Sequence, residues 1–122
     1  MNEDAGVKVL AFVGVALTVA LVAAFSGTTY PVKINGHVGE NATVEGVVSE
    51  VHVAASSGTT FIDMGGRYPA NTFVAVIWPE DVDKFPNVGA LYGQKVKVSG
   101  LLELYHGTQE IILRNAEQLK SE

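Results

Sequence analysis

Residues 95–113, KVKVSGLLELYHGTQEIIL, decide the fold of this chain. Apolar and polar side chains alternate up to Leu104, and a period of two is typical of a strand with one buried face. The pattern breaks at residues 105–109, which include a glycine, and resumes at residues 110–113. Two such runs joined by a short loop predict a β-hairpin. Gly100 in the first run predicts a bend or bulge of the kind that a strongly coiled sheet needs.

Three runs upstream of this hairpin have the composition of strands. They are rich in β-branched and aromatic residues, and they cover residues 42–53, 59–64 and 72–78. The apolar face changes part-way along the first run, which predicts a bulge near Gly46 or Ser49. Residues 79–85 begin with proline and acidic side chains, which favour the first turn of a short helix. Residues 30–34 can add an edge strand, and residues 115–122 form a polar tail or a helical turn.

Five strands with a short helix between the third and the fourth predict an all-β fold class. This is the element order of the five-stranded Greek-key barrel called the OB-fold. The motifs inside the elements are Val44-x-Gly-x-Val48, Gly58-Thr-Thr-Phe61, Gly66-x-Tyr-Pro69, Phe73-x-x-x-Ile77, Gly93-x-Lys-Val-x-Val-x-Gly100, Leu104-Tyr105-x-Gly107 and Glu110-Ile111. They resemble OB-fold domains related to tRNA-anticodon-binding modules, a type found in exported bacterial nucleases and in small secreted proteins described as DNA-binding. The resemblance covers about residues 41–120 and implies one OB-fold domain over residues 41–122.

The resemblance also implies a binding surface across the second and third strands and between two loops. Together with two lysines of the fourth strand, we expect the ligand-binding residues to be Arg67, Tyr68, Asn71, Trp78, Lys95, Lys97, Tyr105, His106 and Gln109. In the expected mechanism the aromatic rings stack on bases, and Arg67, Lys95 and Lys97 contact phosphates. Phe61 and Phe73 also map to this surface, although by residue type both are expected in the barrel core. Related domains usually place basic residues beside the last-loop glycine, where this chain has His106 and Thr108, so phosphate contacts of that type are missing here.

The N-terminal residues form a separate apolar segment. Residues 9–25, VLAFVGVALTVALVAAF, contain no charge and no proline. A membrane span needs about 20 apolar residues and the accepted range begins at about 17, so we expect residues 7–25 to contact the lipid bilayer as a transmembrane anchor. The alternative is a secretory signal peptide that is cut after Ser26. Residues 1–26 are thus an anchor or a signal peptide, and residues 27–40 are a linker.

Lys8 is the only basic side chain before the apolar segment, and it favours a cytoplasmic N-terminus. The domain then lies on the extracytoplasmic side of the cell membrane. It is a single-pass membrane protein if the segment stays and a secreted protein if the segment is cut.

The charge balance bears on the partner of this domain. The chain has a formal net charge of -5, with 13 acidic residues against 8 lysines and arginines. Neutralisation of phosphates supplies most non-specific nucleic-acid affinity, so an acidic chain argues against tight binding of that kind. Two hypotheses therefore stay open: a module for single-stranded nucleic acid, which the motifs favour, and an assembly subunit that binds an envelope protein, which the charge favours.

The sequence predicts no catalytic activity, no cofactor and no metal site. There is no cysteine, which excludes thiolate chemistry. The histidines His37, His52 and His106 are widely separated and lack the spacing of metal-binding motifs. No serine lies in a nucleophile elbow. We therefore expect a binding or structural protein rather than an enzyme.

Overall fold

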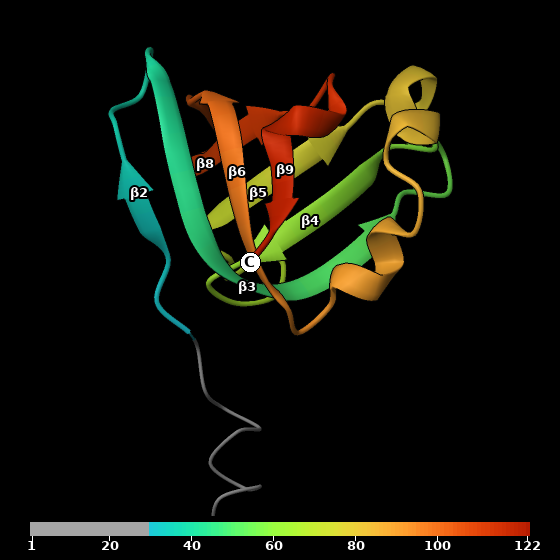
Figure 1. Cartoon of the computed structure of the whole chain (residues 1–122), viewed down its shortest axis with the longest axis horizontal. Coiled ribbons are helices and arrows are strands. Elements are labelled where there is room, and N and C mark those ends of the chain that lie inside the picture. The colour runs from blue at the N-terminus through green and yellow to red at the C-terminus, as the bar shows by residue number, and fades with distance from the viewer. Residues whose placement is uncertain (1–29) are drawn as a thin grey trace, which may run out of the picture.

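The computed structural model describes residues 30–122, and these form one β-rich unit (Figure 1). The predicted all-β class is confirmed. The segment expected to contact the membrane, residues 7–25, lies outside the described residues. Within residues 30–122, no helix has the length and apolar character that crossing a membrane requires.

Eight strands and three short 3-10 helices follow one another along the described part of the chain. The strands are β2 (Lys33–Asn35), β3 (Asn41–Val53), β4 (Thr60–Met64), β5 (Phe73–Ile77), β6 (Lys95–Leu101), β7 (Glu103–Tyr105), β8 (Thr108–Ile112) and β9 (Leu119–Ser121). The helices are η2 (Pro79–Lys84), η3 (Val88–Leu91) and η4 (Ala116–Gln118). The sheet has the order β7-β8-β5-β4-β3-β6-β9, and β2 pairs with β3.

The sequence pattern predicted five strands, and two of the additional ones are short. β2 and β9 have three residues each, and they pair with β3 and β6 respectively. Three residues are too few to display a period of two, so β9 was not predicted, and β2 was expected only as an edge strand outside the five. The edge strand expected at residues 30–34 begins three residues later and ends one residue later, as Lys33–Asn35.

The third additional strand arises because the run predicted as one strand is divided at Leu102. The backbone N–H of Leu102 donates to the Glu40 carbonyl, and its own carbonyl accepts from the Gly39 N–H. Its backbone groups are therefore used by the loop before β3 instead of by a neighbouring strand. Gly100, with φ of 151°, lies just before this break and allows the bend that the sequence predicted.

β3 is long and strongly curved, so that its two halves pair with different strands (Figure 1). Its first half pairs with β6, and its second half pairs with β4. The register with β4 shifts between Val48 and Glu50, so the bulge predicted near Gly46 or Ser49 is present and lies at Ser49. The bulge is tied down because the Ser49 Oγ lies 2.9 Å from the Asp63 carbonyl oxygen and 2.6 Å from that of Gly66.

The predicted hairpin is present with a tighter loop than expected. Tyr105 and Thr108 are paired residues of β7 and β8, so only His106 and Gly107 form the turn. Both have positive φ, 50° and 83°, as a type I′ turn requires. The loop assigned to residues 105–109 was too long, because the polar residues Thr108 and Gln109 belong to a strand.

The core lies inside the curled sheet and is built from alternate residues of the strands. The fully buried side chains include Val44, Val48, Ile62, Met64, Phe73, Ile77, Val96, Val98, Leu102, Ile111 and Leu113. Phe73 is thus a core residue as expected. Phe61 is only half-buried, because Ile62 and Met64 point inward and alternation turns Phe61 outward. Leu104 was predicted to continue the buried face, but it is 59% exposed because it follows the break at Leu102.

The short helix predicted over residues 79–85 is present as η2, a 3-10 helix with proline at its start. Phe85 directly after it is buried, and Val82 packs against the core. The segment between β5 and β6 therefore covers one part of the core. In the predicted polar tail, η4 is the helical turn that the sequence allowed.

Candidate functional site

Outward side chains of β3, β4, β5 and β8 form one surface, which we call the β4–β5 face. Cross-strand pairing places them in two rows. The first row contains His52, Phe61, Val76 and Ile112, of which Val76 is buried with 2% of its surface exposed. The second contains Glu50, Asp63, Val74 and Glu110, and it is extended by Glu103 of β7. An apolar row thus lies beside an acidic row.

Asp63 is the buried member of the acidic row, with 1% of its surface exposed. Its Oδ1 accepts a hydrogen bond from the Asn71 Nδ2 at 3.2 Å. Its Oδ2 accepts no hydrogen bond from any residue in the described range. Burial raises the pKa of this carboxyl from 3.8 to about 6, with the His52 charge lowering it and the Glu50 charge raising it.

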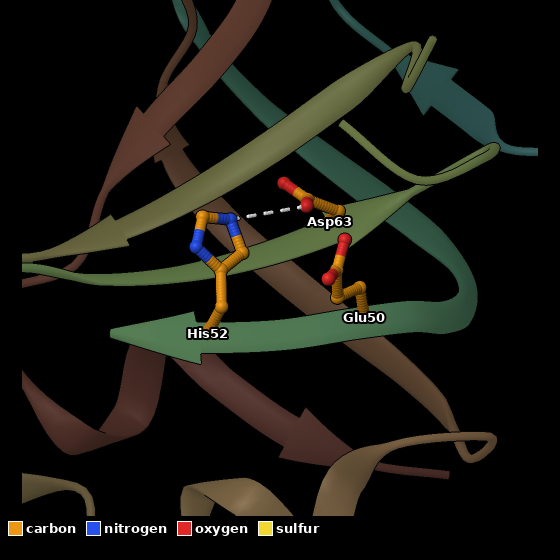
Figure 2. Close-up of side chains that lie close together, drawn as sticks. All are labelled: Glu50, His52 and Asp63. Carbon is orange, nitrogen blue, oxygen red and sulfur yellow. Dashed lines mark ion pairs between the residues drawn. The ribbon is translucent and has the colours of Figure 1, made fainter. Parts of the chain in front are cut away.

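His52 and Glu50 flank Asp63 from the neighbouring strand (Figure 2). The His52 Nε2 lies 3.4 Å from the Asp63 Oδ2, and the ring stacks on Phe61 with centroids 5.0 Å apart. The Glu50 carboxylate forms a long ion pair with Arg67, whose Nη2 lies 3.5 Å from Oε2. The ligating atoms of Glu50, His52 and Asp63 all lie within 4.8 Å of one another. We call these three residues the Glu50–His52–Asp63 cluster.

This cluster was missed from the sequence, which predicted no metal or catalytic group. A signal was present, because Glu50 and His52 are two apart and so share one face of a strand. Asp63 was also the only charged residue in its predicted strand, 59–64. What the sequence lacked was the register, since only the Ser49 bulge sets Glu50 opposite Asp63.

Two of the predicted ligand-binding residues border this cluster, and a third supports it from below the surface. Arg67 and Tyr68 lie in the β4–β5 loop, where the Arg67 side chain is 75% exposed and Tyr68 is 72% exposed. Asn71 is buried, with its amide donating to Asp63 and to the Phe73 carbonyl. Asn71 therefore acts inside the protein as a partner of Asp63 rather than as an exposed contact.

Other predicted residues lie at the ends of strands. Trp78 follows β5 and is 36% exposed, and Tyr105 ends β7 and is 61% exposed. The rings of Tyr105 and His106 contact each other edge to face, with centroids 4.1 Å apart. Gln109 is half-buried in β8, opposite Leu104. These side chains are spread along the rim of the sheet and do not converge on one point.

The predicted lysines belong to a different part of the sheet. Pairing across β2, β3, β6 and β9 places Lys33, Glu45, Lys97 and Lys120 in one row. The Lys97 Nζ lies 3.5 Å from the Glu45 Oε2, and Lys95 lies in the same strand two residues earlier. Lys95 and Lys97 pair with the first half of β3 and not with β4. They are therefore on a different part of the sheet from the β4–β5 loop that carries Arg67 and Tyr68.

Two hollows of the described surface do not coincide with the predicted binding residues. One hollow lies between the η2–η3 segment and β9, lined by residues that include Phe85, Val88 and Leu119. Another lies near Asn41 and Gln118. Neither is lined by any of the nine predicted ligand-binding residues. These two hollows therefore do not support the predicted ligand-binding residues.

The last strand pair adds a second perturbed carboxyl. Glu110 of β8 lies directly opposite Glu103 of β7. Burial raises the pKa of Glu110, and the charge of Glu103 raises it further. Like charges in directly opposed positions destabilise a strand pair, so this end of the face would gain from an approaching positive charge.

Comparisons with protein-family models, with curated proteins and with solved structures found no match to the chain. The geometry of the β4–β5 face and of the cluster within it is therefore the basis for a proposed function.

Proposed function

We propose that the described residues are an OB-type binding module whose β4–β5 face binds a basic, partly apolar segment of another protein. The module is not an enzyme in this proposal. The partner is expected in the cell envelope, since the N-terminal residues have the sequence of an export signal or a membrane anchor.

The OB-type barrel is supported by the order of strand pairing. β3 pairs with β4, β4 with β5, β5 in parallel with β8, and β8 with β7. β6 pairs with the other half of β3, and only Leu102 separates β6 from β7 in the chain. If β6 and β7 are counted as one bent strand, five strands follow one another in a ring, with η2 between the third and the fourth.

The observation that carries the proposed partner is the charge and apolarity of the β4–β5 face. Its acidic row and its extension hold four carboxyl groups, with Arg67 the nearby guanidinium. Phe61, Val74 and Ile112 beside them are half-buried and so partly available for contact. Complementary charge steers and selects a partner, and apolar contact supplies affinity. A basic strand or helix with apolar residues has both properties.

Binding of single-stranded nucleic acid is the second candidate. It is favoured by the exposure of Tyr68 and Tyr105, because stacking of a base on such a ring contributes about 1–3 kcal/mol. It is disfavoured by the acidic row of the β4–β5 face, which repels phosphates. Lys95 and Lys97, the expected phosphate contacts, pair with the other half of β3.

The test compares two labelled probes on the full-length chain in non-ionic detergent, with detergent alone as the blank. One probe is a peptide of alternating lysine and leucine, and the other is oligo(dT). We expect fluorescence anisotropy to show salt-sensitive binding of the peptide, weakened about two- to fivefold by Glu110→Gln. The matched control Glu117→Gln removes an exposed carboxylate of η4 that belongs to neither row of the face, and it should change nothing.

The other outcomes decide against the proposal. Binding of oligo(dT) that Tyr105→Ala weakens would establish the second candidate in its place. Peptide binding that is equally affected by Glu110→Gln and Glu117→Gln would reflect net charge alone and would remove the face from the proposal. If neither probe binds at low salt, both candidates are wrong for this face.

A further inference from the structure

The bulge in β3 brings three ligating side chains together on the β4–β5 face. Ser49 takes up the extra residue, and beyond it Glu50 pairs with Asp63 and His52 with Phe61. The Ser49 hydroxyl lies within hydrogen-bonding distance of two carbonyl groups, those of Asp63 and Gly66, and so fixes the local backbone. Glu50, His52 and Asp63 therefore project from two adjacent, hydrogen-bonded strands rather than from loose loops (Figure 2).

Asp63 is a buried side chain whose hydrogen bonding is not fully satisfied in this region. It is 1% exposed and its Oδ1 is held by Asn71, whereas its Oδ2 has the His52 Nε2 at an ion-pair distance of 3.4 Å and makes no hydrogen bond of good geometry with the residues that the structure describes. A buried acceptor without a donor costs about 1–3 kcal/mol, and more when it is charged. Figure 2 shows that this carboxylate faces the His52 ring, with the Glu50 carboxylate below it. A ligand placed among the three side chains would give the Asp63 Oδ2 the partner that it lacks.

We propose that the Glu50–His52–Asp63 cluster binds a divalent transition-metal ion, with zinc as the best match. The His52 Nε2 and the Asp63 Oδ2 are 3.4 Å apart. Two ligands about 2.1 Å from a tetrahedral ion are themselves about 3.4 Å apart, so this pair is already spaced for zinc. The Glu50 carboxylate is within 4.8 Å and is half-buried, so a change of side-chain rotamer would bring it into the same sphere.

The donor set selects among metals. One imidazole nitrogen with two carboxylates suits zinc and its neighbours in the first transition row. Calcium takes six to eight oxygen ligands and magnesium retains several waters, so neither is matched by this set. Asn71 acts as an outer partner that fixes the Asp63 carboxylate, and stacking on Phe61 fixes the plane of the His52 ring. Three protein ligands leave a fourth position toward solvent, because the His52 side chain is 37% exposed.

Arg67 is the competitor that this site must displace. Its guanidinium lies 3.5 Å from the Glu50 Oε2. It thus forms an ion pair with the carboxylate that would be the third metal ligand, and it places a positive charge beside the site. The pair is exposed on the Arg67 side, and exposed ion pairs contribute only about 0–1 kcal/mol. Metal binding should therefore displace Arg67 easily, and removal of Arg67 should strengthen metal binding.

The experiment titrates zinc chloride into the full-length chain, without a histidine tag, in detergent and after removal of metals with a chelator. Isothermal titration calorimetry should show one ion per chain. Asp63→Asn and His52→Ala should each lower the affinity by more than about tenfold, since even outer partners are worth about 10–100-fold. Arg67→Ala should raise it. Cobalt(II) in place of zinc should give a visible absorption band that His52→Ala changes.

The matched control is His37→Ala. His37 and Glu40 also form a histidine–carboxylate pair, at 3.2 Å, but both side chains are exposed, and Asp63, the buried carboxylate of the described residues, is paired with His52 instead. Zinc affinity that falls equally in His37→Ala and His52→Ala would identify adventitious surface binding and overturn the proposal, as would the lack of any saturable heat.

Glu50→Gln is a second variant that tests the site if Asp63→Asn fails to fold, since Glu50 is partly exposed and should tolerate the change. Unchanged affinity and cobalt spectrum in a folded Glu50→Gln would remove Glu50 from the site.

This proposal shares Glu50 and Asp63 with the acidic row of the proposed function, but its experiment is separate from the peptide experiment. Peptide binding is measured with a chelator present, so a failed zinc titration leaves the peptide result intact, and a failed peptide titration leaves the zinc result intact.

Discussion

At the scale of single residues, Asp63 shows how a buried carboxyl is accommodated. Burial makes its ionised form costly and raises its pKa to about 6, and His52 partly offsets that cost. The Asn71 side-chain amide donates a hydrogen bond to the Asp63 carboxyl. The stability of this region should therefore depend on Asn71 more than on the exposed residues around it.

We expect Asn71→Ala to lower the free energy of unfolding by about 1–3 kcal/mol, because it leaves the Asp63 carboxyl buried without its amide donor. Urea denaturation with a chelator present measures the loss. Asn35→Ala, at an exposed position of β2, is the control and should have little effect. A loss no larger than that of the control would show that the bond to Asp63 contributes nothing.

At the scale of elements, the β7–β8 hairpin combines a well-formed turn with an unfavourable charge pair. His106 and Gly107 adopt the positive φ values of a type I′ turn, which fixes the register of the two strands. That register in turn sets Glu110 directly opposite Glu103. The same geometry that stabilises the hairpin therefore keeps two carboxylates close together on the β4–β5 face.

Glu110→Gln should make the protein more stable at neutral pH than the parent chain. The pKa of Glu110 is raised above 4.5 in the folded state by burial and by Glu103, so the fold favours its protonated form. This contribution is present in full below the unfolded pKa of about 4.5 and is lost as the pH rises through the raised pKa. The gain should be less than about 1 kcal/mol at pH 7 and should vanish near pH 4.

Denaturant unfolding at a series of pH values measures this difference, with a chelator in every sample. Glu117→Gln, at an exposed position of η4, controls for the change in net charge. Parallel stability profiles for Glu110→Gln and the parent chain between pH 4 and pH 7 would contradict the pKa argument.

At the scale of the whole molecule, Leu102 joins the two parts of the sheet. It is fully buried, and it lies between β6, which pairs with β3, and β7, which pairs with β8. Its backbone also bonds to Gly39 and Glu40 at the start of β3. One side chain thus fills the core at the place where the chain passes from one half of the sheet to the other.

Leu102→Ala should cost about 2–5 kcal/mol, the range for deleting a large side chain in a packed core. Leu104→Ala is the matched control, because Leu104 is the same residue type two positions later and is 59% exposed. The control should change stability by about 0.5 kcal/mol or less. Similar losses for the two variants, measured by thermal or urea denaturation, would show that Leu102 is not a core residue.

The alternation in residues 95–113 was enough to predict the hairpin, and apolar runs elsewhere predicted the long strands and the all-β class. These features are local, because a period of two and a glycine-bearing turn depend only on residues that are close together in the sequence. The bulge at Ser49 was also foreseeable, since a change of apolar face within one run requires an extra residue. Phe73 in the core follows from the same local pattern.

The site depended on tertiary structure because its residues come from different strands. Asp63 meets Glu50 and His52 through a register that the bulge sets, and Asn71 turns inward to a partner eight residues away. The lysines expected beside Arg67 lie on β6, which pairs with the other half of a curved β3. Residue type and spacing determine which strands form, but only the pairing of distant strands decides which side chains share a face, and so which charges a ligand would meet.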